Sequence, residues 1–94
     1  MKFALSVPGL LNYPPSMAPW EAHATGKDII RFAKCADALS WDWLTVPEHL
    51  FMPQDMAEVM GQRFPEGITA CAVLAGATER IHLLTYVLVV PYRH

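Results

Sequence analysis

The chain has 94 residues, of which 53% are hydrophobic and 17% are charged, and its formal net charge at pH 7 is −2. An average soluble domain has roughly 45–50% apolar and about 25% charged residues. This chain therefore has more apolar surface than a domain of its size normally buries. The charge provides no basic face for nucleic acid and no polybasic patch for a membrane surface. The composition therefore indicates one unit over residues 1–94 that is a fragment of a larger domain or has an obligate partner.

Targeting and membrane segments are not expected. The apolar residues after Met1 are interrupted by Pro8 and Gly9, which leaves too short a run for the core of a signal peptide. No apolar run reaches the roughly 18 residues of a membrane-spanning helix. Cys35 and Cys71 fall in predicted helices without the spacing of a disulfide or zinc framework, so we expect reduced, buried thiols. These features predict a soluble, cytoplasmic protein.

The first half of the chain predicts one strand and one helix. Residues Phe3–Val7 are apolar and end at Pro8-Gly9, which is typical of a strand buried on both faces. The prolines at positions 14, 15 and 19 exclude regular structure up to Thr25. Thr25 and Asp28 resemble a capping box and begin a helix that continues to Leu39. Its apolar stripe comprises Ile29, Phe32, Ala33, Ala36 and Leu39, and its charged residues Lys27, Arg31, Lys34 and Asp37 lie mostly on the other side.

A second strand and a long connection follow. The β-branched and aromatic run Trp43–Val46 predicts a buried strand, which Pro47 ends because proline has no N–H to donate. The connection from Leu50 to Phe64 exceeds the usual βα loop of about 2–6 residues. Methionines at positions 52, 56 and 60 predict a short helix within it, which forms either a local core or an adaptable lid over an apolar substrate.

The last part of the chain predicts a helix and a third strand. Pro65 and Glu66 are typical of a first helical turn, and the residues that follow, up to Ala77, are apolar on nearly every side. Such a helix needs cover from more than one direction. The continuous apolar run Ile81–Val90 is typical of an interior parallel strand. The predicted order is therefore β-α-β-α-β in the α/β class.

An acid and a histidine, Glu48 and His49, directly follow the second predicted strand. In sheets of parallel βα units, functional side chains gather at the carboxyl ends of the strands. Neighbouring residues of an extended chain point to opposite sides, so we expect only one of the two to enter a pocket. We take this residue to be His49, with Glu48 in structural hydrogen bonds. Ordinary polar loop residues are the alternative interpretation. The histidines at positions 23, 49, 82 and 94 lack a zinc-like spacing, and we expect no metal site.

Several segments, in this order, together resemble the luciferase-like flavin-dependent oxidoreductases, which include bacterial luciferase, flavin monooxygenases and enzymes that use the deazaflavin coenzyme F-420. Members of this family are (β/α)₈ barrels. The resemblance therefore implies a partial TIM barrel with the first three parallel strands, about a third of a domain that needs ~250 residues. The matching segments are Met1–Pro8, Ala33–Trp43, Thr45–Leu50, Ala75–Leu83 and Val87–His94.

The resemblance also implies roles for individual residues. It places Glu48 and His49 at the catalytic rim, where an imidazole can pass a proton or hydrogen-bond a developing oxyanion. It places Tyr86 and Val87 at a bulge, often with a non-proline cis peptide, that contacts the flavin ring as a cofactor-binding element. The chain departs from the family at two positions. Many members have a small or short polar residue in place of Tyr86, and glycine is common in place of Ser40.

The resemblance implies the N-terminal part of an oxidoreductase that acts with reduced flavin (FMN) or F-420 on a small organic substrate. The reaction would be monooxygenation with FMN or hydride transfer with F-420. A glycine-rich phosphate loop is missing from the sequence, as in barrel enzymes that hold phosphates after strands seven and eight. The alternative function is a noncatalytic barrel remnant that self-associates, as a homo-oligomer, or docks to a partner. Tyr92 and Arg93 are interpreted as a solvated loop, with contact to a phosphate as the alternative.

Overall fold

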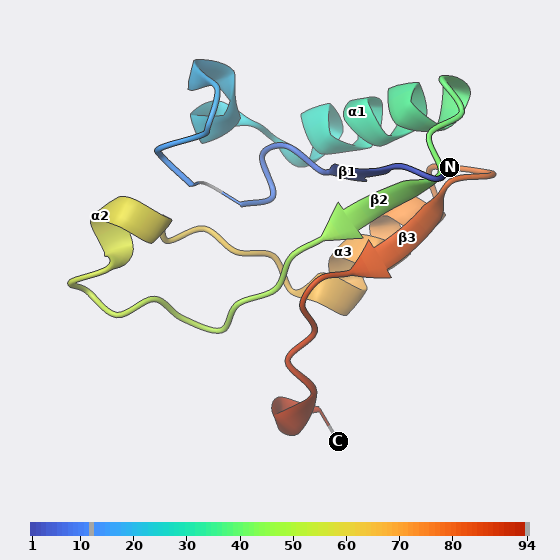
Figure 1. The fold of residues 1–94 in the computed structure, drawn as a ribbon. Helices are drawn as coiled ribbons and strands as arrows, with labels where there is room; N and C mark the ends of the chain where they lie inside the picture. Colours follow the sequence, from blue (N-terminus) through green and yellow to red (C-terminus); the bar gives the residue numbers. More distant parts are fainter. Residues whose placement is uncertain (12, 94) are drawn as a thin grey trace.

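A computed structural model of the chain describes residues 1–11 and 13–93. Strands β1 (Ala4–Ser6), β2 (Trp43–Val46) and β3 (His82–Thr85) form one parallel sheet in the order β1-β2-β3 (Figure 1). Helix α1 (Gly26–Ala38) connects the first two strands, and α3 (Gly67–Ala75) connects the last two. The predicted β-α-β-α-β order and α/β class are confirmed, and this is the architecture of a partial TIM barrel.

One face of the sheet carries the hydrophobic core. Leu5, Leu44 and Leu83 are aligned across the three strands, and Leu44 is fully buried. Helices α1 and α3 cover this face (Figure 1) and contribute Ala33, Ala36 and Leu74 to the core. The side chains of a strand alternate between faces, so the aligned residues Ser6, Thr45 and Leu84 lie on the opposite, open face.

The first and third strands are less covered and shorter than the sequence predicts. β1 spans three residues, and Ala4 and Ser6 are exposed, so the expectation of a strand buried on both faces is wrong. β3 lies at an edge of the described sheet and ends at Thr85 rather than Val90. The ladder stops there because the neighbouring β2 continues into Pro47, which has no N–H to donate. The last described hydrogen bond between the two strands runs from the backbone N–H of Tyr86 to the carbonyl of Val46 (2.9 Å).

Helix α1 begins as predicted. The hydroxyl of Thr25 accepts a hydrogen bond from the Asp28 N–H (3.4 Å), and the Asp28 carboxylate accepts one from the Thr25 N–H (2.9 Å). The Thr25 hydroxyl also donates to the Asp28 carboxylate (2.6 Å). This bond, followed by the one from the Thr25 N–H, lowers the pKa of Asp28. Two residues near the other end differ from the prediction, because Leu39 is 74% exposed and Asp37 is buried. Asp37 has backbone partners in another loop that the helical pattern does not reveal.

Helix α3 also begins differently and remains partly uncovered. Glu66 is its N-cap rather than a residue of its first turn, and its carboxylate accepts hydrogen bonds from the N–H groups of Ile68 (3.4 Å) and Thr69 (2.6 Å). The Thr69 side chain, followed by the Thr69 N–H, lowers the pKa of Glu66. The core contacts one side of the helix, while Ile68 and Val73 are about half exposed. The expected cover from further directions is not found among the described residues.

The cysteines are free, as predicted, but they are not both buried. Cys35 is exposed and Cys71 is half-buried. Partial burial raises the pKa of the Cys71 thiol, and the nearby Glu66 carboxylate raises it further. The expectation of two buried thiols is therefore wrong for Cys35, because its position on α1 faces solvent.

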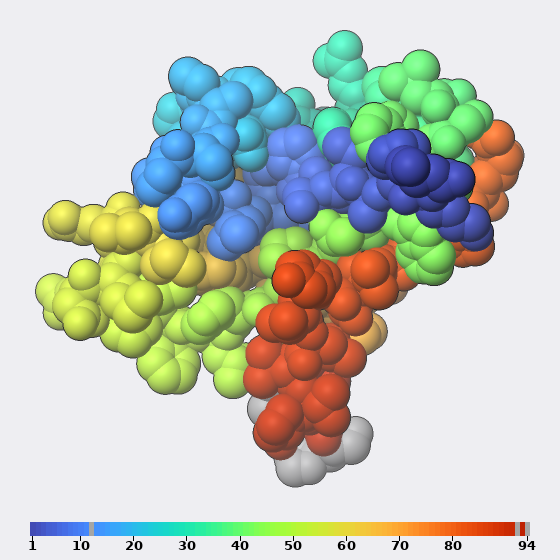
Figure 2. Space-filling view, viewed as in Figure 1, coloured from blue at the N-terminus to red at the C-terminus, as the bar shows by residue number. Residues whose placement is uncertain are grey.

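The long connections extend from the carboxyl ends of the strands (Figure 1). The first includes a 3₁₀ helix, η1 (Pro19–His23), where the sequence predicts no regular structure. Proline is favourable in a first helical position, and Glu21 accepts a bond from the Ala18 N–H (2.9 Å). The second contains the predicted short helix, α2 (Ala57–Met60). The segment after β3 includes η2 (Val90–Tyr92) and projects from the body of the molecule (Figure 2).

Within the described ranges, no helix combines the length and apolar character that are needed to cross a membrane.

Asp37 joins the end of α1 to the start of β3. Its carboxylate accepts hydrogen bonds from the N–H groups of Glu79 (2.8 Å), Arg80 (3.2 Å) and Ile81 (2.9 Å). The Arg80 guanidinium donates to the backbone carbonyl of Asp37 and contacts the Ser40 hydroxyl (3.4 Å). Ser40 itself has φ of 62°, the left-handed conformation that glycine adopts at the lowest cost.

We predict that Asp37 makes stability sensitive to acid. Its backbone partners, first of all the Glu79 N–H, lower the pKa of the folded carboxyl. The pKa of an unfolded Asp is about 3.9, so the contribution of Asp37 is present above that pH and is lost as the pH falls through the lower, folded value. Asp37→Asn should reduce the loss of folding stability at low pH. Urea unfolding at a series of acidic pH values measures this loss.

The matched control is Asp55→Asn, at an exposed position of the long connection. It should leave the acid dependence as in the parent chain. Equal acid dependence of the parent and Asp37→Asn would contradict the assignment.

Candidate functional site

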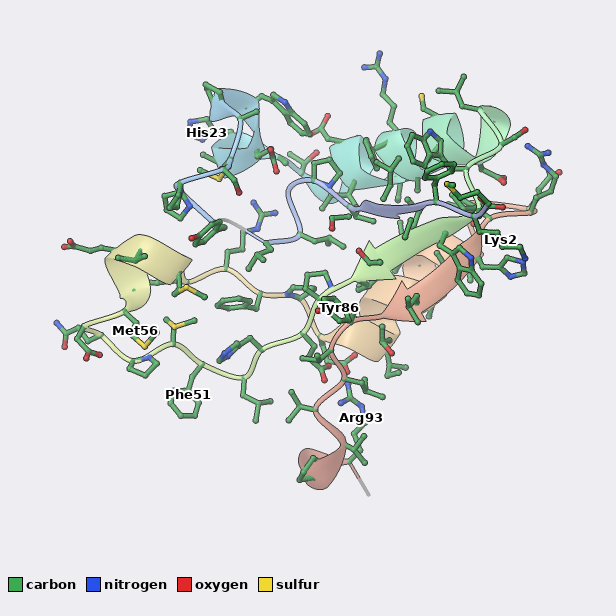
Figure 3. The ribbon with its side chains drawn as sticks, viewed as in Figure 1. Lys2, His23, Phe51, Met56, Tyr86 and Arg93 are labelled. Atoms are coloured by element: carbon green, nitrogen blue, oxygen red, sulfur yellow. The ribbon has the colours of Figure 1, made fainter. Side chains whose placement is uncertain are left out.

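The predicted site residues all lie at the carboxyl rim of the sheet. Glu48 and His49 follow β2, and Tyr86 and Val87 follow β3. Figure 3 shows Tyr86 at the end of β3 and Arg93 on the segment beyond it. Glu48 is 3% exposed, whereas His49 is exposed. The two neighbours therefore have opposite environments, as their alternation along the chain predicts.

Glu48 connects three parts of the chain. Its Oε1 accepts a hydrogen bond from the Gly67 N–H (2.8 Å) at the start of α3, and its Oε2 accepts one from the Val89 N–H (2.7 Å) beyond β3. A Cβ at position 67 would lie 3.1 Å from Glu48 Oε1, so glycine allows the helix to approach this closely. The side chain of Glu48 thus makes structural hydrogen bonds, as expected.

Arg93 neutralises the buried carboxylate, which corrects its interpretation as part of a solvated loop. Its side chain is 23% exposed and forms a two-pronged ion pair with Glu48. Nη1 donates to Glu48 Oε2 (2.7 Å), and Nη2 donates to Glu48 Oε1 and to the Glu66 carboxylate. Nη1 also donates to the Val89 carbonyl (2.9 Å). Sequence reasoning missed this residue, although a buried acid after a strand implies a nearby cation.

His49 lies in an apolar cleft of about 360 Å³. The cleft lies between the end of β2, the long connection and the segment after β3. The imidazole packs against the Phe64 ring, with 4.8 Å between centroids and 37° between planes. Besides Glu48, the residues that line this cleft are His49, Leu50, Phe51, Pro53, Val87 and Val89. Leu50 and Phe51 are themselves exposed. Figure 3 labels Phe51 on the long connection.

Tyr86 and Val87 border two different cavities. Val87, 58% exposed, lines the cleft of His49. Tyr86, 70% exposed, lines a second cavity of about 420 Å³, whose other lining residues include Ser6, Tyr13, Ser16 and Thr45. The peptide bond between Tyr86 and Val87 is cis, and this confirms the cis bond that the family resemblance implies here. The structure therefore brings Val87, but not Tyr86, beside His49.

The lining of the cleft of His49 is mostly apolar. Its walls are apolar apart from the imidazole and the already paired Glu48. In the described ranges, no group of three or more metal-binding side chains is close enough to hold an ion. His94, one of the four histidines, lies outside the described residues.

We predict that Glu48 contributes far more to stability than its neighbour. Glu48→Ala removes the most buried partner of Arg93 and the acceptor of two backbone N–H groups, so the free energy of unfolding should fall by about 3–5 kcal/mol. His49→Ala is the matched control, and loss of its ring contact should cost about 1 kcal/mol or less. Urea unfolding followed by tryptophan fluorescence measures both, and equal losses would refute the prediction.

The model of the family described as luciferase-like monooxygenase matches residues 1–94, the whole chain. Neither the curated proteins nor the solved structures contain a significant match. Because the family match covers every residue, this chain belongs to the luciferase-like monooxygenase family.

Proposed function

We propose that the chain contributes part of the active site of an oxidoreductase that uses a reduced flavin, FMN or F-420, with a small organic substrate. The observation that carries this proposal is the cleft in which His49 and Val87 lie together at the carboxyl rim. Its apolar walls suit the face of a flavin ring, and membership of the luciferase-like monooxygenase family favours such a cofactor. The residues proposed to contact the flavin are His49, Val87 and, from the second cavity, Tyr86.

His49 is the residue proposed to handle protons. Its imidazole is exposed to the cleft, and the Phe64 ring supports one side of it. A neutral imidazole has one nitrogen that donates and one that accepts, so His49 can hold or pass a proton at the edge of a bound ring. When bound, a reduced FMN supplies electrons for oxygen insertion, and a reduced F-420 supplies a hydride.

The other proposed roles are supportive. Val87 and Val89 provide apolar walls, and Phe51 on the long connection lies where a lid would close over an apolar substrate. Glu48 positions the rim through its hydrogen bonds and does not face the cofactor directly in this proposal. The free cysteines favour a reducing compartment, and we propose a cytoplasmic protein.

Cofactor titration tests the proposal. FMN and F-420 are added separately to the protein, and binding is followed by cofactor fluorescence. His49→Asn should weaken binding of the accepted cofactor by about 10-fold, because one hydrogen bond to it is lost. His82→Asn is the matched control, because His82 packs against Trp43 at the other end of the sheet (4.7 Å between centroids).

The control should bind like the parent chain. Binding of neither cofactor to the parent would overturn the proposal, and equal effects of the two histidine substitutions would remove His49 from the site.

A noncatalytic role through self-association is the second candidate, and the exposed apolar residues favour it. Ile68 and Val73 on α3, and Leu84 on the open face of the sheet, are between 43% and 50% exposed. Burial of such residues stabilises association. This candidate predicts oligomers in sedimentation velocity together with no binding of either cofactor. A monomer that binds a flavin would exclude it.

A further inference from the structure

We propose that Arg93 is a positioning residue for the cleft of His49. It acts by holding Val89, one wall of the cleft, at a fixed separation from the end of β2. The inference rests on the proposed function, because the cleft that Arg93 supports is the one proposed to hold the flavin. Arg93 itself is not among the residues that line the cleft.

The first step of the argument is that both polar groups of the Val89 backbone are held. The Val89 N–H donates to Glu48 Oε2 (2.7 Å), and the Val89 carbonyl accepts from Arg93 Nη1 (2.9 Å). The same Nη1 donates to Glu48 Oε2 (2.7 Å). Val89, Glu48 and Arg93 thus form a closed ring of hydrogen bonds, which resists displacement of Val89 in either direction.

The second step is that this ring joins both walls of the cleft. Glu48 is adjacent in sequence to His49, and Val89 lies two residues after Val87. The Val89 side of the cleft belongs to the segment after β3, which has no ladder to β2 beyond the Tyr86 N–H. Hydrogen bonds through Glu48 and Arg93 take the place of the ladder there. The separation of His49 from Val87 and Val89 therefore depends on them.

The third step is that Arg93 extends the support to α3. Its Nη2 contacts the carboxylates of both Glu48 and Glu66, and Glu66 is the N-cap of α3. Arginine can serve these acceptors together because its guanidinium is a rigid planar fork, whereas lysine offers a single point charge. The position requires the shape of arginine as well as its charge. Figure 3 shows Arg93 directed from its segment toward the sheet.

The chain contains a matched control at the opposite end of the sheet. Arg80 donates to the backbone carbonyl of Asp37, and it forms an ion pair with the Asp37 carboxylate (3.9 Å). The Arg80 pair therefore resembles the Arg93 pair in chemistry but does not line the cleft. Arg80→Gln tests the general loss of an arginine that bridges two elements, and Arg93→Gln tests the loss of the one that supports the cleft.

The experiment has two readouts on these variants and on Arg93→Lys. The first is the NMR signals of the His49 ring and of the Val87 and Val89 amides in the ligand-free protein. The second is the Kd for FMN, measured by fluorescence. Arg93→Gln and Arg93→Lys should shift the cleft signals and raise the Kd for FMN by about 10-fold or more, because small misplacements at a binding site reduce affinity strongly. Arg80→Gln should leave the cleft signals unshifted and the Kd for FMN within about 2-fold of the value for the parent chain.

The outcomes separate the two proposals. In one outcome the parent chain does not bind FMN, but the cleft signals shift in the Arg93 variants and not in Arg80→Gln. This outcome overturns the FMN form of the proposed function and supports the positioning role. Cleft signals that respond equally to the Arg80 and Arg93 variants, or to neither, overturn the positioning role. If the Arg93 variants do not fold, amide exchange in the parent decides. A Val89 amide that exchanges as fast as an unstructured peptide overturns the role, and one slowed about 100-fold or more supports it.

Discussion

The burial of the Glu48 carboxylate is the constraint on which the rim of this molecule depends. An ionised carboxylate in an apolar environment is unstable unless it is paired and hydrogen-bonded. Here the start of α3, the segment after β3 and the Arg93 guanidinium all provide donors. Because the donors come from two separate parts of the chain, the start of α3 and the segment after β3, satisfying one charge brings both parts to the end of β2. The position of His49 is then a consequence, since it follows Glu48 directly and points the other way.

A second acid has a similar role at the opposite end of the sheet. Asp37 collects three backbone N–H groups from the loop before β3, and Arg80 bonds to its backbone. The two ends of the sheet differ in what lies beside the acid. Beside Glu48 there is an apolar cleft with an exposed imidazole, whereas the Asp37 contacts fix a connection between α1 and β3. The stability of the sheet and the geometry of the site therefore rely on the same kind of interaction at separate places.

The sequence predicts the order of the elements and the opposite environments of Glu48 and His49, because both follow from local periodicity. It does not predict Arg93, whose contact with Glu48 spans 45 residues. The end of β3 was also mispredicted, because the run Ile81–Val90 contains no signal of its own. The missing donor is the N–H that Pro47 lacks, directly after the neighbouring strand β2. Asp37 differs from the helical pattern for the same reason, since its partners lie 42 to 44 residues away. Contacts between distant segments are thus the part that local patterns do not encode.

The alternation between Glu48 and His49 has a consequence for how the length of the chain can vary. Inserting or deleting one residue between Val46 and Glu48 would exchange the sides to which the following residues point. The carboxylate would then enter the open cleft, and the imidazole would meet Arg93 and the start of α3, where it cannot replace a two-pronged acceptor. The long connection after Leu50 is free of this restriction, because its residues are outside the alternating segment. Variation in length among related chains should therefore be concentrated after Leu50 and absent from Val46 to His49.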